Sequence, residues 1–297
     1  MVHEVVLKEE RQEQKTYALK QYFLDSDEAT QCAQRELRIL KRIASEHSKS
    51  PFITDLLCSF FASGSLVLVL TKGQQFNLFS LLSFCRAIPE SNAKFYSCEI
   101  LSGLGYLHAM GVMHLNLEPR NILFTDSGHL LISNFSCAYD TNHKRGPPQE
   151  EDYRGDKYYM APEVASRTSI SSKSDVWSFG ALMAKMARLL IEFDKRFALT
   201  KSSSWKIENF DKLPKLQQHL IIACLQSRPR HRPSVIEIKR FPYFCDVNWN
   251  SVVSLSQLPP KHRSRIISKY GPLPSNLGNH LESLSAPEFS PSLNFLS

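Results

Sequence analysis

Short apolar runs separated by polar residues occupy the first 70 positions of the chain. Each run is brief and ends at turn-forming residues, so strands are predicted at 5–7, 16–19, 53–61 and 66–70. Residues 27–43 instead repeat apolar side chains every three or four positions, which predicts a helix with one buried face. This part of the chain is therefore predicted to form a small, mostly antiparallel sheet with one helix.

Helical periodicity dominates from residue 74 onward. Helices are predicted at 78–84, 92–110, 176–190 and 215–225. Two apolar strands, 122–124 and 130–132, flank an Asp-Ser-Gly turn and predict a hairpin. Residues 137–157 are polar and mixed in charge, which predicts a mobile loop. The Ser-, Pro- and Leu-rich sequence beyond Trp249 predicts a partly disordered tail. The predicted fold class is α+β.

Charge and hydropathy exclude several classes of partner. The 297 residues carry a formal net charge of +7, and the basic residues form three separate groups, at 35–42, 228–232 and 261–269. Clustered Lys and Arg can neutralise phosphates. Such small groups are more typical of solvated helix faces and a basic tail, so no nucleic-acid partner is expected. No stretch approaches the ~20 apolar residues that span a bilayer, so no membrane span is expected.

The seven cysteines are widely spaced and odd in number, and no two form a Cys-x-x-Cys pair. This pattern predicts neither a disulfide framework nor a zinc site. Most of the cysteines are expected to be small buried side chains. Free thiols fit a reducing compartment, and residues 1–10 hold no apolar run suited to a signal peptide. A cytoplasmic protein that can also occur in the nucleus is therefore expected.

A series of short motifs runs through the chain in a fixed order. They read Tyr-Ala-Leu-Lys at 17–20, Arg-Glu-Leu-Arg at 35–38, His-Leu-Asn-Leu-Glu-Pro-Arg-Asn at 114–121, Asn-Phe-Ser at 134–136, Ala-Pro-Glu at 161–163 and Asp-Val-Trp-Ser-Phe-Gly at 175–180. One such motif is a weak signal, whereas the ordered series is specific. In these residues the chain resembles the protein kinases, most closely the AGC group of serine/threonine kinases and its ribosomal-protein-kinase-like members.

The resemblance extends from about residue 2 to about residue 260 and implies a two-lobed, kinase-like fold. It implies a kinase-like domain at 1–244, made of a small lobe at 1–70 and a helical lobe at 74–244, and an AGC-like tail at 245–297. The family's Gly-rich phosphate loop would fall before and around Met1. The small lobe is therefore expected to be truncated at that loop, and ATP binding is expected to be weak.

The resemblance also implies a nucleotide-binding role for Lys20 and Glu36. Lys20 would hold the α- and β-phosphates of ATP, and an ion pair with Glu36 would orient its ammonium group. The alternative is an unrelated surface lysine and a solvated helix glutamate.

Apolar residues of both lobes would surround the adenine if the resemblance holds. Leu70 occupies the gatekeeper position, followed by the hinge at 71–73. Val5 and Ala18 would cover one face of the adenine and Leu123 the other. The alternative is that all four are ordinary core residues.

Residues 114–121 align with the family's catalytic loop, His-Arg-Asp-Leu-Lys-Pro-Glu-Asn. The two agree at His114, Leu117, Pro119 and Asn121. Asn116 replaces the aspartate that accepts the substrate hydroxyl proton, and a neutral amide is a far poorer base. Glu118 replaces the lysine that neutralises the γ-phosphate, so it would repel the charge that develops during transfer. Leu115 replaces the arginine that ties this loop to a phosphorylated activation segment.

The metal-binding motif of the family is altered in the same way. Asn134 stands where the family has an aspartate that binds Mg²⁺, a hard cation that prefers carboxylates and phosphates. Asn121, the other metal ligand of the family, is retained. Ser136 replaces the following glycine. A site of two amides and no acid is predicted, so Mg²⁺ binding is doubtful.

Acidic residues precede the Ala-Pro-Glu motif. Asp152 occupies the position of the activating phosphothreonine of AGC kinases, which suggests a built-in phosphate mimic. The alternative, a solvated acidic loop at 150–152, is favoured because Leu115 has removed the partner arginine. Asp156 replaces a threonine that contacts the catalytic loop in the family.

Residues that carry the kinase fold are better kept than those that carry its chemistry. Glu163 is expected to pair with Arg232, and Asp175 to hold the backbone of the catalytic loop. The apolar regulatory spine of the family is expected to be built from Leu40, Leu56, His114 and Phe135.

This selective loss favours a pseudokinase that works as a scaffold or allosteric partner of other signalling proteins, such as an active kinase. One alternative is a serine/threonine kinase with residual activity, for which Glu118 or Asp126 would have to supply the missing acid. Another is a module that binds nucleotide without catalysis.

Overall fold

The computed structural model describes residues 2–6, 16–71, 73, 76–85, 88–143, 148–187, 191–193, 205–207 and 210–260. The chain forms two compact units. The first, called the sheet unit here, comprises Met1–Ser45, Asp55–Lys72 and Pro260–Ser297. The second, called the helical unit, comprises Glu46–Thr54 and Gly73–Pro259.

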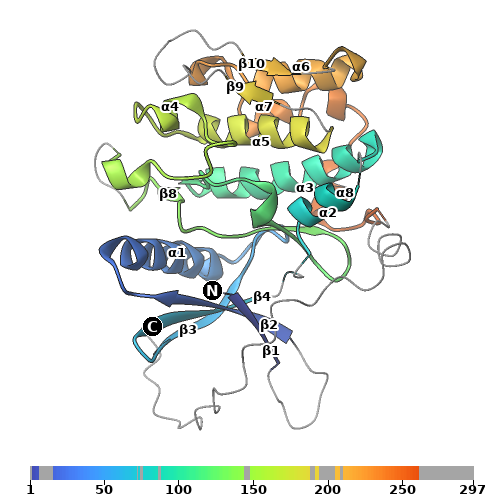
Figure 1. The fold of residues 1–297 in the computed structure, drawn as a ribbon. Helices are drawn as coiled ribbons and strands as arrows, with labels where there is room; N and C mark the ends of the chain where they lie inside the picture. Colours follow the sequence, from blue (N-terminus) through green and yellow to red (C-terminus); the bar gives the residue numbers. More distant parts are fainter. Residues whose placement is uncertain are drawn as a thin grey trace. The chain divides into compact units, whose positions relative to one another are not determined.

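The sheet unit contains one antiparallel sheet with a helix packed against it (Figure 1). In spatial order its strands are β1 (Val2–Val6), β2 (Thr16–Phe23), β4 (Ser65–Thr71) and β3 (Leu56–Ala62), and its helix is α1 (Asp27–Ser45). The helix contacts β2 and β3. The predicted small antiparallel sheet with one helix, and with it the α+β class, is confirmed.

The strand predicted from residue 53 begins three residues later. Ile53 forms a bridge with Ile132, and the Thr54 amide donates to the Ile132 carbonyl at 3.0 Å, both within the helical unit. These two residues are therefore hydrogen-bonded to another strand before β3 starts. A continuous apolar run cannot reveal such a change of partner, because both segments are buried.

Helix α1 has end residues that suit its dipole. The Ser26 hydroxyl accepts a hydrogen bond from the Ala29 amide at 3.2 Å, and Asp27 and Glu28 occupy the first turn. One face of the helix is buried, and it includes Ala33, Glu36, Ile39, Leu40 and Ile43. Spacings of three and four residues bring these side chains together against the sheet, as predicted.

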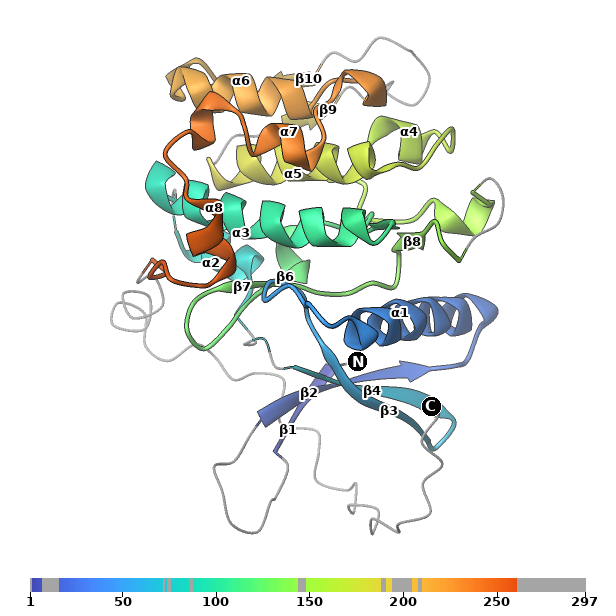
Figure 2. The ribbon, with the colours of Figure 1, turned by 180° about the vertical axis from the view of Figure 1, so that it is seen from behind.

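Three long helices form the body of the helical unit: α3 (Glu90–Ala109), α5 (Ser172–Met186) and α6 (Lys215–Cys224). Helix α5 contacts the other two, and the short helices α7 (Val235–Ile238) and α8 (Trp249–Val253) pack on α3 (Figure 2). The remaining helices are α2 (Leu78–Phe84) and α4 (Pro162–Ala165). Gly180 permits the close approach of α5 and α6, because a Cβ there would lie 2.6 Å from Cβ of Cys224.

The hairpin predicted in this unit is present as β6 (Ile122–Phe124) and β7 (Leu130–Ile132). Glu99 on α3 anchors it, since its carboxylate accepts from the Leu130 amide at 2.8 Å and pairs with His129 at 2.5 Å. Two further strand pairs were not predicted. They are β5 (Val112–Met113) with β8 (Tyr139–Asp140), and β9 (Ile191–Phe193) with β10 (Trp205–Ile207).

The described residues of 137–157 are mostly loop, as predicted, and the mobility of this segment stays a prediction. The segment also contains two short elements that were not predicted, β8 and a 3-10 helix, η2 (Glu150–Asp152), and Asp140 and Asp152 are buried. These two acidic side chains accept hydrogen bonds from nearby backbone amides, which polar composition alone does not reveal. Residues 144–147 lie outside the described part of the chain, as does the tail from residue 261.

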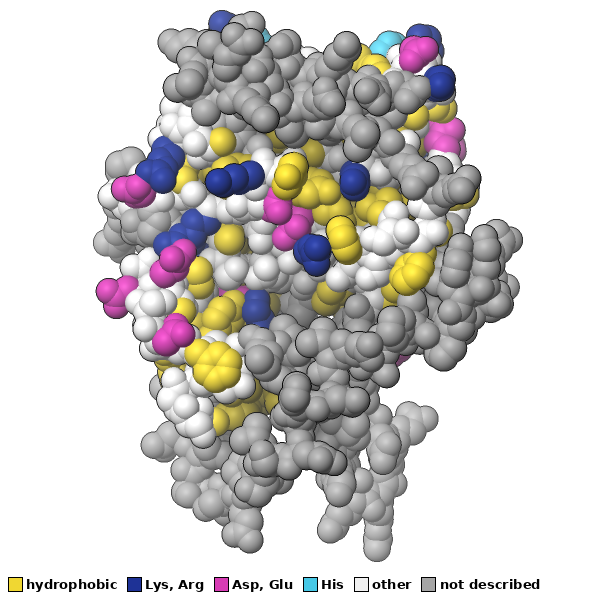
Figure 3. All heavy atoms as spheres, viewed as in Figure 1, with side chains coloured by type: hydrophobic (Ala, Val, Ile, Leu, Met, Phe, Trp, Pro, Cys, Tyr) yellow, Lys and Arg dark blue, Asp and Glu magenta, His cyan; other side chains and the backbone are white. Residues whose placement is uncertain are grey.

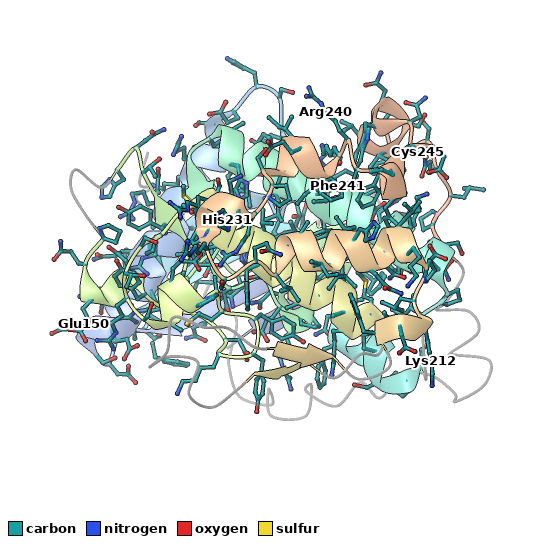
Figure 4. The ribbon with its side chains drawn as sticks, turned by 90° about the horizontal axis from the view of Figure 1, so that it is seen from above. Glu150, Lys212, His231, Arg240, Phe241 and Cys245 are labelled. Carbon is teal, nitrogen blue, oxygen red and sulfur yellow. The ribbon has the colours of Figure 1, made fainter. Side chains whose placement is uncertain are left out.

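The cysteine prediction is only partly correct. All seven cysteines lie in the described part of the chain and none forms a disulfide there, but only Cys98 and Cys224 are buried, fewer than predicted. Cys245 is exposed at the edge of the helical unit (Figure 4). Within the described ranges, no three His, Cys, Asp or Glu side chains gather in a way that would hold a metal ion.

Charged groups are distributed over the surface of the helical unit. On the face drawn in Figure 3, Lys and Arg side chains are interspersed with Asp and Glu side chains. Lys212, His231 and Arg240 come from three separate segments (Figure 4). The basic group at 228–232 is also divided, because Arg232 is buried against Glu163. The helices that the structure describes include none with the length and hydropathy needed to cross a bilayer.

Candidate functional site

A buried aspartate of α5 organises the catalytic-loop motif. The Asp175 carboxylate accepts hydrogen bonds from the His114 and Leu115 amides, both at 2.8 Å, and lies 2.8 Å from Nε2 of His108. Leu115 has a φ of 59°, a left-handed conformation that these bonds help to hold. Burial alone would raise the pKa of Asp175, but the hydrogen bonds and nearby histidines lower it below the ordinary value. The predicted role of Asp175 in holding this backbone is confirmed.

The predicted Glu163–Arg232 ion pair is also present. The guanidinium group donates to both carboxylate oxygens, at 2.6 and 2.7 Å, and both side chains are buried. Ser174 donates to the same carboxylate at 2.9 Å, and the guanidinium group lies 5.0 Å from the centroid of the Trp177 ring. Bidentate geometry and extra donors are what a buried pair needs to offset its desolvation.

His114 and Phe135, two residues of the predicted spine, are in contact. Their rings meet edge to face with centroids 5.2 Å apart, and Nε2 of His114 lies 3.0 Å from the Ser133 carbonyl. Leu40 and Leu56 are buried within the sheet unit. The stacking of these two leucines on the histidine stays a prediction.

Asn116, at the position of the catalytic aspartate, is engaged by the activation segment. Its Oδ1 accepts a hydrogen bond from the backbone amide of Asp156 at 3.0 Å. The neighbouring Gly155 has a φ of +141°, and a Cβ there would collide with the Leu115 carbonyl oxygen. Only glycine fits this close approach. Asp156, which replaces a threonine that contacts the catalytic loop in the family, thus contacts that loop through its backbone amide.

Asn121 and Asn134, the two predicted metal ligands, are joined by a hydrogen bond. Nδ2 of Asn134 donates to Oδ1 of Asn121 at 3.1 Å, and Oδ1 of Asn134 accepts from the Ser136 hydroxyl at 2.9 Å. Nδ2 of Asn121 in turn donates to the Asn116 carbonyl at 2.8 Å. Each amide oxygen that could face a cation thus already accepts a hydrogen bond within the protein. A donor set of neutral amides fits Mg²⁺ poorly.

Glu118 brings a carboxylate to the same group of side chains. It lies 3.4 Å from Nδ2 of Asn121, and its pKa is raised by partial burial and by the nearby Asp156 carboxylate, against the lowering effect of Arg120. Arg120 lies over the ring of Phe79, 4.0 Å from its centroid. Two carboxylates, those of Glu118 and Asp156, and the guanidinium group of Arg120 therefore interact electrostatically beside the catalytic-loop motif.

Asp126, the other predicted compensating acid, lies in the exposed turn of the hairpin. Asn121 precedes the first hairpin strand and the turn follows that strand. A strand of three residues is about 10 Å long, so Asp126 is at the far end of the hairpin from Asn121. Glu118, in contrast, belongs to the loop motif and lies 3.4 Å from Nδ2 of Asn121.

Within the sheet unit, Nζ of Lys20 lies 2.6 Å from Oε2 of Glu36. Glu36 is only 1% exposed. The predicted ion pair is therefore present, and the alternative of a solvated glutamate is wrong. Tyr22 also donates its phenol O–H to the same oxygen, a contact that was not predicted.

The residues predicted to surround adenine lie in both units. Ala18 on β2 is opposite Leu70 on β4, and Val5 on β1 is opposite Tyr17 on β2. In the helical unit, Leu123 on β6 packs against Gly73, where an added Cβ would lie 2.6 Å from Cβ of Leu123. Their role toward a nucleotide stays a prediction.

The acidic segment before the Ala-Pro-Glu motif behaves differently at its two ends. Glu150 is exposed and pairs with Arg167. Asp152 is 1% exposed and accepts from the Gln149 amide at 2.9 Å, closing a capping box on η2. The prediction of a solvated acidic loop is therefore wrong for Asp152. Its carboxylate satisfies the start of a helical turn, a role that a count of charges does not reveal.

Comparisons with known proteins agree with these motifs. The family model described as "Protein kinase domain" matches residues 2–244. Similar proteins include "Ribosomal protein S6 kinase 2 alpha" of Xenopus laevis and "Ribosomal protein S6 kinase alpha-2" of Homo sapiens, each 31% identical over 219 residues. Each alignment covers 71% of this chain and 30% of the relative, so the chain spans about 30% of the length of these relatives. The chain belongs to the protein kinase family.

Proposed function

We propose that this protein is a pseudokinase: a kinase-fold protein that transfers little or no phosphate and acts by binding other signalling proteins. The single observation that carries the proposal is Asn116, a neutral amide at the position of the catalytic base, with its oxygen engaged by the Asp156 amide. We further propose that the partners include an active kinase, and that the protein works in the cytoplasm and nucleus.

The chemistry of the surrounding residues supports the same proposal. A positioned general base contributes about 10²–10⁴-fold to a rate, and an amide cannot take up the proton at neutral pH. Glu118 would repel the negative charge that spreads over a phosphoryl group during transfer. The bonded pair Asn121–Asn134 offers a hard cation no carboxylate of its own. These losses act on one step, so their effects are not additive.

A phosphate-transfer assay tests the proposal directly. Purified wild type and Lys20→Ala would be incubated with labelled ATP, Mg²⁺ or Mn²⁺ and a generic protein substrate, beside an active kinase as positive control. We expect no transfer that depends on Lys20. A robust wild-type signal that disappears in Lys20→Ala would overturn the proposal and favour a serine/threonine kinase with residual activity.

Nucleotide binding without catalysis is a second candidate, and the Lys20–Glu36 ion pair favours it. An ammonium group held in place by a buried carboxylate is suited to phosphate oxygens. A thermal-shift titration with ATP, with and without Mg²⁺, would test it. Weak binding would appear as a concentration-dependent rise in Tm, whereas no rise at millimolar ATP would rule against it.

A further inference from the structure

Two donors on β2 converge on one carboxylate oxygen of α1. Lys20 and Tyr22 are two positions apart on the strand, so their side chains share one face of the sheet. Nζ of Lys20 lies 2.6 Å from Oε2 of Glu36, and the phenol O–H of Tyr22 donates to that same Oε2. The Lys20 ammonium group also lies 5.0 Å from the centroid of the Tyr22 ring. Each of these three side chains thus interacts with the other two.

The burial of Glu36 makes the second donor important. An ionised carboxylate that is 1% exposed is costly unless charges and hydrogen bonds compensate it. Lys20 supplies a charge, but its long side chain has several rotatable bonds and loses entropy when it is held. Tyr22 supplies a neutral donor on a rigid ring, which loses less freedom. The phenol can therefore hold the carboxylate in place and present a π face to the ammonium group.

The position of Glu36 on α1 extends this effect to the helix. Glu36 belongs to the buried face of α1, between Ala33 and Ile39, and the helix packs on β2 and β3. A polar group bonded twice to β2 fixes the rotation of that face, which apolar packing alone specifies less sharply. This clamp, formed by Lys20, Tyr22 and Glu36, lies entirely within the sheet unit.

We propose that Tyr22 is a positioning residue that keeps Lys20 and Glu36 together, and α1 docked on the sheet, without any bound nucleotide. The inference rests on the proposed function, since a protein that works by binding must keep its shape when its nucleotide site is empty. The clamp replaces the need for phosphate groups to hold Lys20 in place.

Hydrogen exchange of α1 amides in nucleotide-free protein tests the clamp. Tyr22→Phe keeps the ring and deletes only the hydroxyl, so we expect exchange in α1 to become roughly tenfold faster, as loss of one charge-assisted hydrogen bond would allow. Acylation of Lys20 by acetic anhydride, followed by mass spectrometry, should accelerate as well, relative to Lys41 and Lys49. A tyrosine that serves only in packing would leave Lys20 labelling unchanged, because the ring is retained.

Tyr17→Phe is the matched control. Tyr17 lies on the same strand, five positions away and hence on the opposite face, and loses the same hydroxyl. It should leave α1 exchange and Lys20 labelling at wild-type values. Exchange in α3 of the helical unit is the internal reference and should be unaffected.

Two outcomes would overturn the inference. They are a Tyr22→Phe variant identical to wild type and equal acceleration in α1 and α3. Failure of the proposed function is seen separately, as phosphate transfer in the Lys20→Ala comparison. Protection of α1 in the absence of nucleotide does not depend on that result.

Discussion

Two hydrogen-bonded groups of the helical unit differ in whether their side chains are charged or neutral. The brace, formed by Glu163 and Arg232, keeps its buried charges and the ion pair expected of it. Asp175 likewise keeps its bonds to the backbone of the catalytic-loop motif. The amide chain is formed by Asn116, Asn121 and Asn134, which bond to one another. Asn116 and Asn134 stand where the kinase family has acids, whereas Asn121 is the same as in the family. The contrast separates what the fold needs from what phosphate transfer needs. The charges of the brace are retained, whereas two positions that hold acids in the family's catalytic and metal-binding motifs hold amides here.

Breaking the brace should have the largest effect on stability. Arg232→Met leaves the Glu163 carboxylate buried without its guanidinium partner, so we expect a loss of about 3–5 kcal/mol. Chemical denaturation followed by fluorescence would measure it. Arg230→Met removes an exposed arginine from the same 3-10 helix region and should change stability by less than about 0.5 kcal/mol. Equal effects of the two variants would show that the brace does not carry the stability assigned to it.

Disrupting the contact between the activation segment and the catalytic loop should cause the second-largest loss of stability. Gly155→Ala combines a positive φ with a collision against the Leu115 carbonyl oxygen, and we expect a cost of about 2–3 kcal/mol. Gly64→Ala is the control, because Gly64 has a φ of +73° but an added Cβ there meets nothing within 4 Å. It should cost only about 1–2 kcal/mol. If the two variants lose the same stability, the close approach is unimportant.

Removing one hydrogen bond from the amide chain should lower the free energy of unfolding by less. Ser136→Ala removes the hydroxyl that donates to Oδ1 of Asn134 at 2.9 Å, and we expect a loss of about 0.5–1.5 kcal/mol. Thermal unfolding would measure this loss, with exposed Ser127→Ala as the comparison. If Ser136→Ala lost as much stability as Arg232→Met, the amide chain would stabilise the fold as strongly as the brace does, contrary to our expectation.

Substitution of Glu118 should change stability the least, and the change should depend on pH. Its folded-state pKa is raised, so the folded protein holds this proton more tightly than the unfolded chain does. The resulting stability is fully present below the ordinary glutamate pKa and is lost as the pH rises through the folded pKa. Glu118→Gln cannot titrate, so at neutral pH it should be more stable than wild type by a few tenths of a kcal/mol, given that the group is half exposed and screened.

Lowering the pH tests the direction of this stability difference between Glu118→Gln and wild type. The advantage of Glu118→Gln should shrink as the pH falls through the folded pKa, and it should vanish below the ordinary glutamate value. Denaturation curves of both proteins between pH 3 and pH 8 would record the difference. An advantage that grows toward acid pH would mean that the Glu118 carboxylate is stabilised rather than strained in the fold.

Local patterns and long-range patterns were not equally predictable from the sequence. Helix α2 and the β6–β7 hairpin have the predicted bounds, because a cap, a turn and an apolar run lie within a few neighbouring residues. The β5–β8 pair was missed, since two strands of two residues each carry no periodicity.

The candidate site shows the same limit. The resemblance to the protein kinases predicted the Lys20–Glu36 pair, but not the third partner Tyr22. The predicted strand ended at residue 19, whereas β2 continues to Phe23, so strand alternation was not applied to Tyr22. Alternation also does not say which helix residue meets a given face of a strand. The hydrogen bond between Asn121 and Asn134 could not be predicted from the sequence either, because the orientation of a side-chain amide depends on its neighbours in space.

That one hydrogen bond also determines the effect of an acid at position 134. In Asn134→Asp, a carboxylate oxygen would face Oδ1 of Asn121, an acceptor against an acceptor. Rotation of the Asn121 amide would relieve this repulsion only by turning its oxygen toward the Asn116 carbonyl, which now accepts from Nδ2 of Asn121. The substitution is therefore unfavourable unless a cation binds between the two oxygens. Restoring one acid to this site requires its neighbours to change as well.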